Sequence, residues 1–328
     1  MLRCVLQSLA AIFLLLVFSQ CSNAPFLGGG SRESQLKRMG YVSVPLKKVP
    51  GDVRYSGAFL VNGTPLQFLI DSGANSTDVD HLTAKRVGLR RSSSLGVITR
   101  GALGREMRSG LGRGSLQVGP MRAENFSFTI APEGQKIPTS TSRYAGQVGL
   151  DMLSSTGSLV DIPRGLLWVP REVTKRSLTG VISPLGPMPV LGKKMLMMGT
   201  ADRLPHLILH GTVKGEQVSW VVDTGAEISV MDALSFQKLG LPSVMTHARM
   251  IDAAGDRVAL RKSRIRNMSF GEVKIRTFDI AIAPLGEVKR FFKDPTGRPV
   301  DGIIGMDFLT QGEALLDSGS KILYMGMP

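Results

Sequence analysis

The sequence is poor in cysteine: Cys4 and Cys21 are the only two, and both lie near its start. The residues after Cys21 therefore contain no pair of thiols, which excludes an internal disulfide there. An apolar fraction of 43% with 20% charged residues is typical of a folded globular protein and not of a disordered one. A length of 328 residues favours two domains over a single core.

Aromatic residues are also scarce, at 6%, although the formal net charge is +14. A positive charge permits contact with nucleic acids or membrane surfaces. The Lys and Arg residues are scattered, however, and no nucleic-acid recognition motif accompanies them, so we expect no nucleic-acid partner. The sequence also lacks a Gly-x-Ser-x-Gly motif, which disfavours a serine hydrolase.

Long hydrophobic runs are absent except for Val5–Phe18, which follows Arg3 and precedes Cys21. This run is shorter than the roughly 20 residues of a membrane-spanning helix. Its layout resembles a bacterial lipoprotein signal, in which the cysteine after the cleavage site carries a lipid. We expect a signal at 1–21, a flexible tether at 22–40, and a body in the periplasm or cell envelope, anchored to the membrane through Cys21. An uncleaved N-terminal anchor is the alternative.

The rest of the chain consists of short apolar runs separated by Gly, Pro, Asn-Gly or Lys-Gly, which predicts mostly β structure. Two of these runs form a repeat. Residues 59–70 and 212–222 each predict a β-hairpin with a glycine in its turn, and the second strand of each leads into an aspartate, Asp71 or Asp223. The two aspartates are 152 residues apart.

A second block of the repeat, at 148–153 and 304–309, has a spacing of 156 residues. Self-similarity over this length predicts a duplicated fold. We therefore expect an all-β protein of two β-barrel lobes with short helices, lobe 1 at 41–172 and lobe 2 at 190–328, joined by a linker at 173–189.

Each copy of the repeat carries one short acidic motif after its apolar strand. The motifs are Asp71-Ser72-Gly73-Ala74 and Asp223-Thr224-Gly225-Ala226. An Asp-Ser/Thr-Gly pattern alone is weak evidence, because Asp317-Ser318-Gly319 also fits it. That third match is equivalent to residues 161–164 in the repeat, so we expect it to be a hairpin tip and not a catalytic loop.

The two recurring motifs resemble the aspartic peptidase family, and the retropepsins and their bacterial relatives most closely. The resemblance covers nearly everything from about residue 40 to the C-terminus, twice. It implies an aspartic-type endopeptidase with Asp71 and Asp223 as the catalytic pair and a protein or peptide as substrate. It also implies that the residues around them form the active-site loops and that Gly149 and Gly305 pack beneath these loops.

Two carboxylates can hydrolyse a peptide bond without a metal ion or a cofactor. We therefore expect no metal ion and no cofactor. One carboxylate can activate a water molecule while the other, protonated, supplies an acid, because like charges about 3 Å apart do not both ionise. Ser72 and Thr224 offer hydroxyl groups that can brace the loops across the lobe interface. Since both aspartates lie in one chain, we expect an active monomer in which the lobes pair as a pseudo-dimer.

Between each loop and its glycine block, the resemblance implies a flap, a hairpin that covers the substrate. The tips are predicted at 97–104 in lobe 1 and 251–258 in lobe 2; the candidate tip residues are Gly101, Ala102, Ala254 and Gly255. Residues 289–298, with Phe291 and Phe292, form a basic and aromatic insertion that lines the cleft or, alternatively, is an ordinary surface loop.

Other interpretations of the same residues stay open. A peptide-binding module without turnover could use the same fold, because a fold does not determine activity. The two aspartates could simply cap turns. His206 and His210 fall on one face of a strand-like segment, but with no third ligand near them we expect exposed strand residues and not a metal site.

Overall fold

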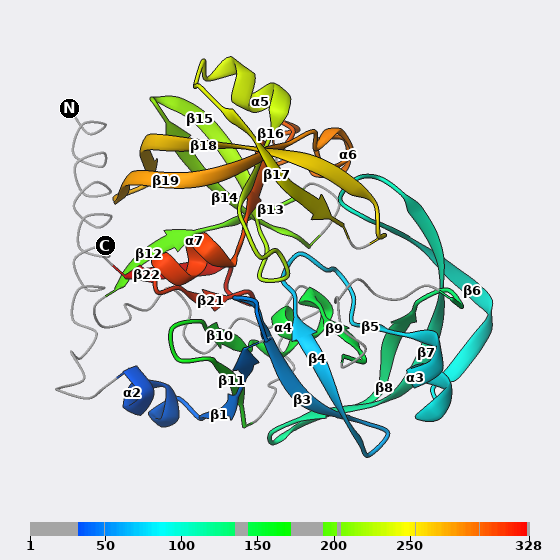
Figure 1. The fold of residues 1–328 in the computed structure, drawn as a ribbon. Coiled ribbons are helices and arrows are strands. Elements are labelled where there is room, and N and C mark those ends of the chain that lie inside the picture. Colours follow the sequence, from blue (N-terminus) through cyan, green and yellow to red (C-terminus); the bar gives the residue numbers. More distant parts are fainter. Residues whose placement is uncertain are drawn as a thin grey trace, which may run out of the picture. The chain divides into compact units, whose positions relative to one another are not determined.

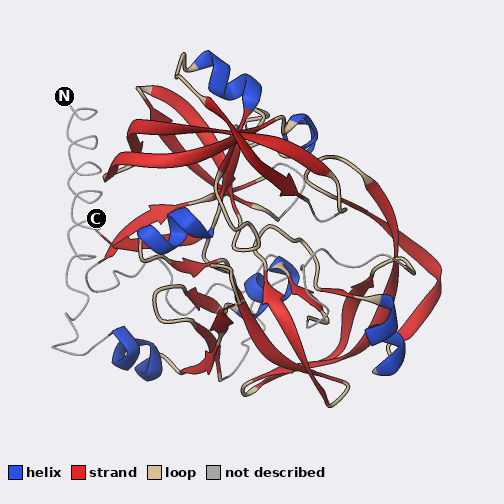
Figure 2. Cartoon of the chain, in the orientation of Figure 1, coloured by secondary structure: helices blue, strands red, loops and turns tan. Residues whose placement is uncertain are grey.

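The computed structural model describes residues 32–48, 50–134, 144–171, 193–201, 205–252, 254–294 and 296–326, in which strands predominate and helices are short (Figure 2). Residues 36–328 form one compact unit and 1–35 another. Of the second unit only 32–35 are described, at the start of α2 (Arg32–Arg38). The predicted signal with Cys21 and the linker at 173–189 lie outside the described residues. Among the helices that are described, none is long and apolar enough to cross a membrane.

The first half of the chain forms an eight-stranded sheet in the order β2-β3-β4-β9-β5-β8-β7-β6, with an added pairing of β3 and β7 (Figure 1). Its strands are β2 (Lys47–Lys48), β3 (Tyr55–Val61), β4 (Thr64–Ile70), β5 (Asp78–Val79), β6 (Arg90–Arg100), β7 (Glu106–Val118), β8 (Met121–Ile130) and β9 (Gly146–Val148).

The second half forms another eight-stranded sheet in the order β13-β14-β15-β20-β16-β19-β18-β17, with an added pairing of β14 and β18. Strand for strand, this order repeats that of the first sheet. Its strands are β13 (Gly199–Thr200), β14 (Leu207–Val213), β15 (Glu216–Val222), β16 (Val230–Asp232), β17 (Val244–Ile251), β18 (Arg257–Phe270), β19 (Val273–Ala283) and β20 (Gly302–Ile304).

A third sheet takes three strands from each half, in the order β1-β11-β10-β21-β22-β12. At its centre Val160 of β10 lies opposite Leu316 of β21, 156 residues later, so an approximate two-fold axis relates the halves. Asp317 ends β21 at a hairpin turn, as predicted. The expected all-β fold of two duplicated lobes is confirmed, whereas the exact lobe boundaries stay predictions. The strands are β1 (Tyr41–Pro45), β10 (Leu159–Asp161), β11 (Leu166–Pro170), β12 (Lys193–Met197), β21 (Leu315–Asp317) and β22 (Ile322–Gly326).

The hairpins that lead to the aspartates have the same turn in both lobes. Asn62 and Gly63 have φ values of 48° and 80°, and Lys214 and Gly215 have values of 52° and 87°. Positive φ at both central residues defines the two-residue turn that matches the twist of a β-hairpin. The turn therefore fixes the strand register, and the register decides where each second strand ends.

Short helices close the sheets at equivalent places. Asp80 caps α3 by accepting a hydrogen bond from Thr83 N at 2.9 Å, and Asp232 caps α5 by accepting one from Ser235 N at 3.0 Å. Such caps satisfy backbone donors that the first turn leaves free. The helices of the compact unit after α2 are α3 (His81–Arg86), α4 (Leu150–Thr156), α5 (Ala233–Lys238), α6 (Gly286–Phe291) and α7 (Met306–Gln311).

One pair of cross-strand neighbours is polar in lobe 1 and apolar at the equivalent place in lobe 2. Asp78 of β5 faces Gln147 of β9, whereas Val230 of β16 faces Ile303 of β20 at the equivalent place. The Asp78 carboxylate accepts hydrogen bonds from Ser76 Oγ at 2.9 Å and from Gln147 Nε2 at 3.0 Å. Burial raises the pKa of Asp78 to about 7, because the charged form loses its hydration.

Asp78 should make the stability of the protein depend on pH. Its pKa is higher in the folded protein than in the unfolded chain, so the folded state binds the proton more tightly. Its stabilising effect is present below about pH 4 and is lost as the pH rises towards 7. The free energy of unfolding should fall as the pH rises through this range, because unfolding releases up to about one proton from Asp78. In Asp78→Asn this contribution is lost, so the fall should be smaller. Urea unfolding at several pH values measures the difference.

The control for this measurement is Glu124→Gln, which removes a carboxylate from an exposed ion pair with Arg122. That variant should keep the parent's pH dependence. If Asp78→Asn also keeps the parent's pH dependence, the pKa of the Asp78 carboxyl is not raised in the folded protein.

Candidate active site

The two aspartate loops begin where the central strands of the two sheets end. Asp71 follows β4, which runs parallel to β9, and Asp223 follows β15, which runs parallel to β20. The amide of Asp71 donates to Val148 O at 3.0 Å, and the amide of Asp223 donates to Ile304 O at 2.9 Å. Each aspartate is therefore fixed by the neighbouring parallel strand of its own lobe.

The hydroxyl groups of Ser72 and Thr224 join the two loops. Ser72 N donates to Thr224 Oγ1 at 2.9 Å, and Thr224 N donates to Ser72 Oγ at 3.0 Å. In turn Ser72 Oγ donates to Val222 O, and Thr224 Oγ1 donates to Ile70 O, both at 2.9 Å. Both side chains are buried. These four hydrogen bonds, which we call the hydroxyl bridge, obey the two-fold relation between the lobes.

The glycines of the two motifs let the opposite carboxylates come close. A β-carbon on Gly73 would lie 2.5 Å from Asp223 Oδ1, and one on Gly225 would lie 2.5 Å from Asp71 Oδ1. No side chain fits at such distances. The loops are therefore in contact across the interface, with each carboxylate against the backbone of the other lobe.

Glycines of the second repeat block lie beneath the loops, in the places predicted for them. A β-carbon on Gly149 would lie 2.5 Å from Ser76 O, and one on Gly305 would lie 2.6 Å from the carbonyl carbon of Ile228. The residue after each glycine holds the alanine of its loop. Leu150 N donates to Ala74 O at 2.8 Å, and Met306 N donates to Ala226 O at 2.9 Å.

The two carboxyl groups meet at the lobe interface, each against the glycine of the opposite loop, and both are only partly exposed. Burial, and then the charge of Asp223, raises the pKa of Asp71 well above its ordinary value. Burial also raises the pKa of Asp223, but its hydrogen bonds from Asp71, Gly225 N and Ala226 N act in the opposite direction. The pair therefore retains one proton at a pH where ordinary carboxyl groups are fully ionised.

One basic side chain from each lobe reaches the loop of the other lobe. Arg54 Nη1 donates to Gly225 O at 3.2 Å, and His206 Nε2 lies 2.8 Å from Gly73 O. The expectation that His206 is an exposed strand residue is wrong: it is 3% exposed, because it packs between the lobes just before β14. His210 is exposed as expected, and its Nδ1 lies 3.1 Å from Ser219 Oγ.

The two predicted flap tips contact each other. The Asp252 carboxylate of lobe 2 accepts a hydrogen bond from Leu103 N of lobe 1 at 2.8 Å. The same carboxylate accepts from Ala254 N at 3.0 Å and from Asp256 N at 2.9 Å within its own turn. Asp252 is 5% exposed, so the contact excludes most water.

The other tip residues fit this contact. A β-carbon on Gly101 would lie 2.7 Å from Asp252 Cγ, so the tip of lobe 1 needs a glycine there. Ala102 packs against an apolar cluster of lobe 2, and Ala226 of the aspartate loop packs against the same cluster. Gly255 has a φ of 85°, which suits the tight turn of the second tip.

The basic and aromatic insertion at 289–298 contacts both the flap of lobe 1 and the histidine behind the loop. Arg100 of β6 lies over the ring of Phe291, 4.3 Å from its centre. Phe292 meets the ring of His206 edge-on, with 4.3 Å between the ring centres. The insertion is therefore packed against the predicted flap tip of lobe 1 and against His206.

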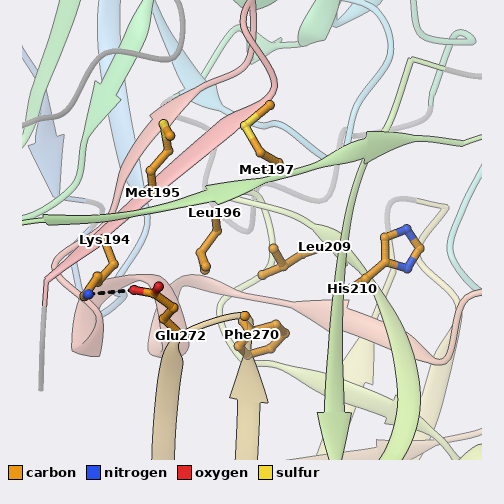
Figure 3. A pocket seen from close by; sticks show the side chains of 9 residues that line it. Lys194, Met195, Leu196, Met197, Leu209, His210, Phe270 and Glu272 are labelled. Carbon is orange, nitrogen blue, oxygen red and sulfur yellow. Dashed lines mark hydrogen bonds and ion pairs between the residues drawn. The ribbon is translucent and has the colours of Figure 1, made fainter. Parts of the chain in front are cut away.

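A cavity of about 430 Å³ opens elsewhere in the second half of the chain, near an ion pair of Lys194 and Glu272 (Figure 3). None of its lining residues belongs to the aspartate loops or the flap tips, so it is separate from the candidate active site. The lining residues are Lys194, Met195, Leu196, Met197, Leu209, His210, Phe270, Gly271 and Glu272.

Comparison with known proteins agrees with this arrangement. The sequence matches the model of a family described as "Aspartyl protease" in two segments, residues 58–150 and 209–308, which together make up more than half of the chain. Each segment contains one aspartate loop and one glycine block. No curated protein is significantly similar to the chain.

Among solved structures, the aspartic proteinase from Irpex lacteus is similar in fold, with a TM-score of 0.51 and 13% identity over 88% of this chain and 97% of that one. Basic 7S globulin from soybean gives a TM-score of 0.46 and 10% identity over 88% and 95%. At this identity the first likeness supports the fold alone, while the family model supports membership. The chain belongs to the aspartyl protease family, as a retropepsin-like member in which both lobes are present in one duplicated chain.

Proposed function

We propose that the protein is an aspartic-type endopeptidase in which Asp71 and Asp223 act as one catalytic pair. The observation that carries this proposal is the meeting of two partly exposed carboxyl groups at the lobe interface, each against the glycine of the opposite loop. A structural pair of aspartates, each capping its own turn, would not need backbone glycines that admit the carboxylate of the other lobe.

The chemistry follows from the single proton of the pair. The ionised carboxylate removes a proton from a water molecule whose oxygen bonds to the carbonyl carbon of the peptide, and the protonated carboxyl gives its proton to the carbonyl oxygen. The proton taken from water then moves to the amide nitrogen. As the C–N bond breaks, one hydroxyl of the intermediate returns a proton to the carboxylate that acted as the acid, and a carboxylic acid and an amine leave. The hydroxyl bridge keeps both carboxyl groups in place during these transfers.

The complete pair lies within one chain, which supports an active monomer. We expect Asp71→Asn and Asp223→Asn each to lower kcat by about a thousandfold or more while the fold is retained, because one carboxyl cannot supply both acid and base. Turnover of a mixed peptide library and circular dichroism are the measurements, and a statine-type inhibitor should suppress the parent activity.

The activity of each single variant separates pairing within a chain from pairing between the counterpart lobes of two chains. If each lobe paired with its counterpart in another chain, one site in each variant dimer would keep both aspartates, and each single variant would remain active. That result would contradict the proposal. Peptide binding without turnover in the parent protein would instead support a peptide-binding module.

The contact of the flap tips supports a role in closing the cleft over a bound peptide. We expect Asp252→Ala to open it, because Leu103 N loses its acceptor on the other lobe. Hydrogen exchange in the segment around Leu103 should become about fivefold faster, since one lost hydrogen bond is worth roughly 1 kcal/mol. The control is Asp279→Ala, which removes an exposed carboxylate from an ion pair with Arg264. Unchanged exchange in Asp252→Ala would show that this carboxylate does not hold the tips together.

We also propose that the protein is held at the outer side of the membrane by a lipid on Cys21. The support is the apolar run at 5–18 and the position of Cys21 directly after it. In Cys21→Ser we expect the body to leave the membrane fraction or the precursor to stay uncleaved, measured by fractionation and intact mass. A variant of mature size that stays in the membrane fraction would refute lipidation at this residue.

A further inference from the structure

Arg54 and His206 occupy equivalent places in the two lobes. Each stands 17 residues before the aspartate of its own lobe, and each immediately precedes the first long strand of its sheet, β3 or β14. Each also reaches across the interface to the carbonyl of the glycine in the opposite loop. The duplication therefore keeps the position and the target while changing the side chain.

The surroundings of Arg54 are charged. Asp52 accepts hydrogen bonds from Arg54 Nε, at 2.7 Å, and from Nη2, which leaves Nη1 to bind Gly225 O. Glu227, from the loop of Asp223, and Asp71 also act electrostatically on the guanidinium. A guanidinium stays protonated at every relevant pH. A cation is therefore fixed beside the loop of Asp223.

Among the described residues, no acidic side chain contacts the ring of His206. The equivalents of Asp52 and Glu227 in the sequence are Leu204 and Asn75, neither of which is acidic. Because a carbonyl oxygen only accepts, His206 Nε2 must carry the hydrogen, which leaves Nδ1 without one. Nδ1 has no hydrogen-bond partner among the described residues, and burial lowers the pKa of His206 to about 4. The imidazole is thus uncharged above that pH.

The aspartates themselves differ in the same sense. Asp223 Oδ1 accepts two backbone hydrogen bonds, from Gly225 N at 2.7 Å and Ala226 N at 3.1 Å. Asp71 Oδ1 accepts one backbone hydrogen bond, from Gly73 N at 2.8 Å. Donors of this kind favour the ionised carboxylate, so the extra donor stabilises charge on Asp223.

We propose that Arg54 and His206 are positioning residues that make the catalytic pair unequal, so that Asp223 carries the negative charge and Asp71 carries the proton. Arg54 braces one loop and adds a cation beside it, and His206 braces the other loop without adding charge. This inference rests on the proposed function. It assigns Asp223 as the base that deprotonates water and Asp71 as the acid.

Other charged groups act on the pair. Asp71 is subject to the negative charge of Asp223, which opposes its ionisation. Arg54 acts to lower the pKa of Asp223 and also interacts with Asp71, but its hydrogen bond to the loops is made to Gly225 O, beside Asp223. Asp52 and Glu227 both act on Arg54 and weaken its field.

Glutamine substitutions at Arg54 and His206 test their roles through activity, because glutamine can still donate a hydrogen bond but carries no charge. In Arg54→Gln the acidic limb of the pH profile of kcat/KM should move to higher pH by about half a unit to one unit, because Asp223 loses a cation that favours its ionisation. In His206→Gln the acidic limb should stay in place while kcat falls. Arg54→Lys should keep the limb near its parent position, because the charge is retained.

Matched controls are Arg264→Gln, which breaks an exposed pair of the same kind with Asp279, and His210→Gln, which replaces the exposed histidine of the same segment. Neither should move the profile. A purely structural role of Arg54 and His206 would lower activity in both variants without moving either limb, and that outcome would overturn the proposal.

A second measurement does not need turnover. The carboxyl carbons of ¹³C-labelled aspartate are titrated by NMR in Asp71→Asn and in Asp223→Asn, where one member of the pair remains. The remaining carboxyl should ionise at lower pH when it is Asp223 than when it is Asp71. Equal or reversed titrations would overturn the proposed inequality. If the two carboxyl groups titrate unequally but the parent protein has no peptidase activity, the proposed inequality holds and the proposed function is wrong.

Discussion

The hydroxyl bridge between Ser72 and Thr224 is the interaction on which the candidate site depends. Each backbone amide of the bridge finds its acceptor in the other lobe, and each hydroxyl then donates to a strand end of that lobe. Removing one partner would leave a buried donor or acceptor unsatisfied, which costs about 1 to 3 kcal/mol. The loops can therefore meet in only one register, and that register brings the two carboxyl groups together.

The duplication gives the two lobes the same arrangement of strands, and sequence differences between the two copies make the lobes chemically different. The sheets repeat strand for strand, and the central sheet places Val160 opposite Leu316. Within this arrangement the polar pair of Asp78 and Gln147 contrasts with an apolar pair in lobe 2. A protein assembled from two identical chains could not vary its halves separately, whereas a single chain with two lobes can.

Much of this arrangement was predictable from the sequence, because the repeat carries long-range information. The all-β duplicated fold, the two hairpins and the hairpin tip at Asp317 followed from periodicity and turn residues. The pairing of the flap tips through Asp252 did not, because no local pattern indicates which hydrogen-bond donors a distant carboxylate will meet.

The braces Arg54 and His206 were missed for a different reason. Arginine and histidine share no residue-type pattern, so only their common offset of 152 residues, the offset of the aspartates, could have indicated them. His206 was predicted to be exposed because it falls with His210 on one face of a strand-like segment that has no third metal ligand near it. Its burial results from the other lobe, which covers that edge and which strand periodicity does not describe.

The claim that one chain forms one complete site is tested most directly by titration with a tight-binding, statine-containing peptide, combined with sedimentation of the complex. We expect one inhibitor bound per monomeric chain, with the same stoichiometry at every protein concentration. One inhibitor for every two chains, or binding that appears only when the chains associate, would contradict it.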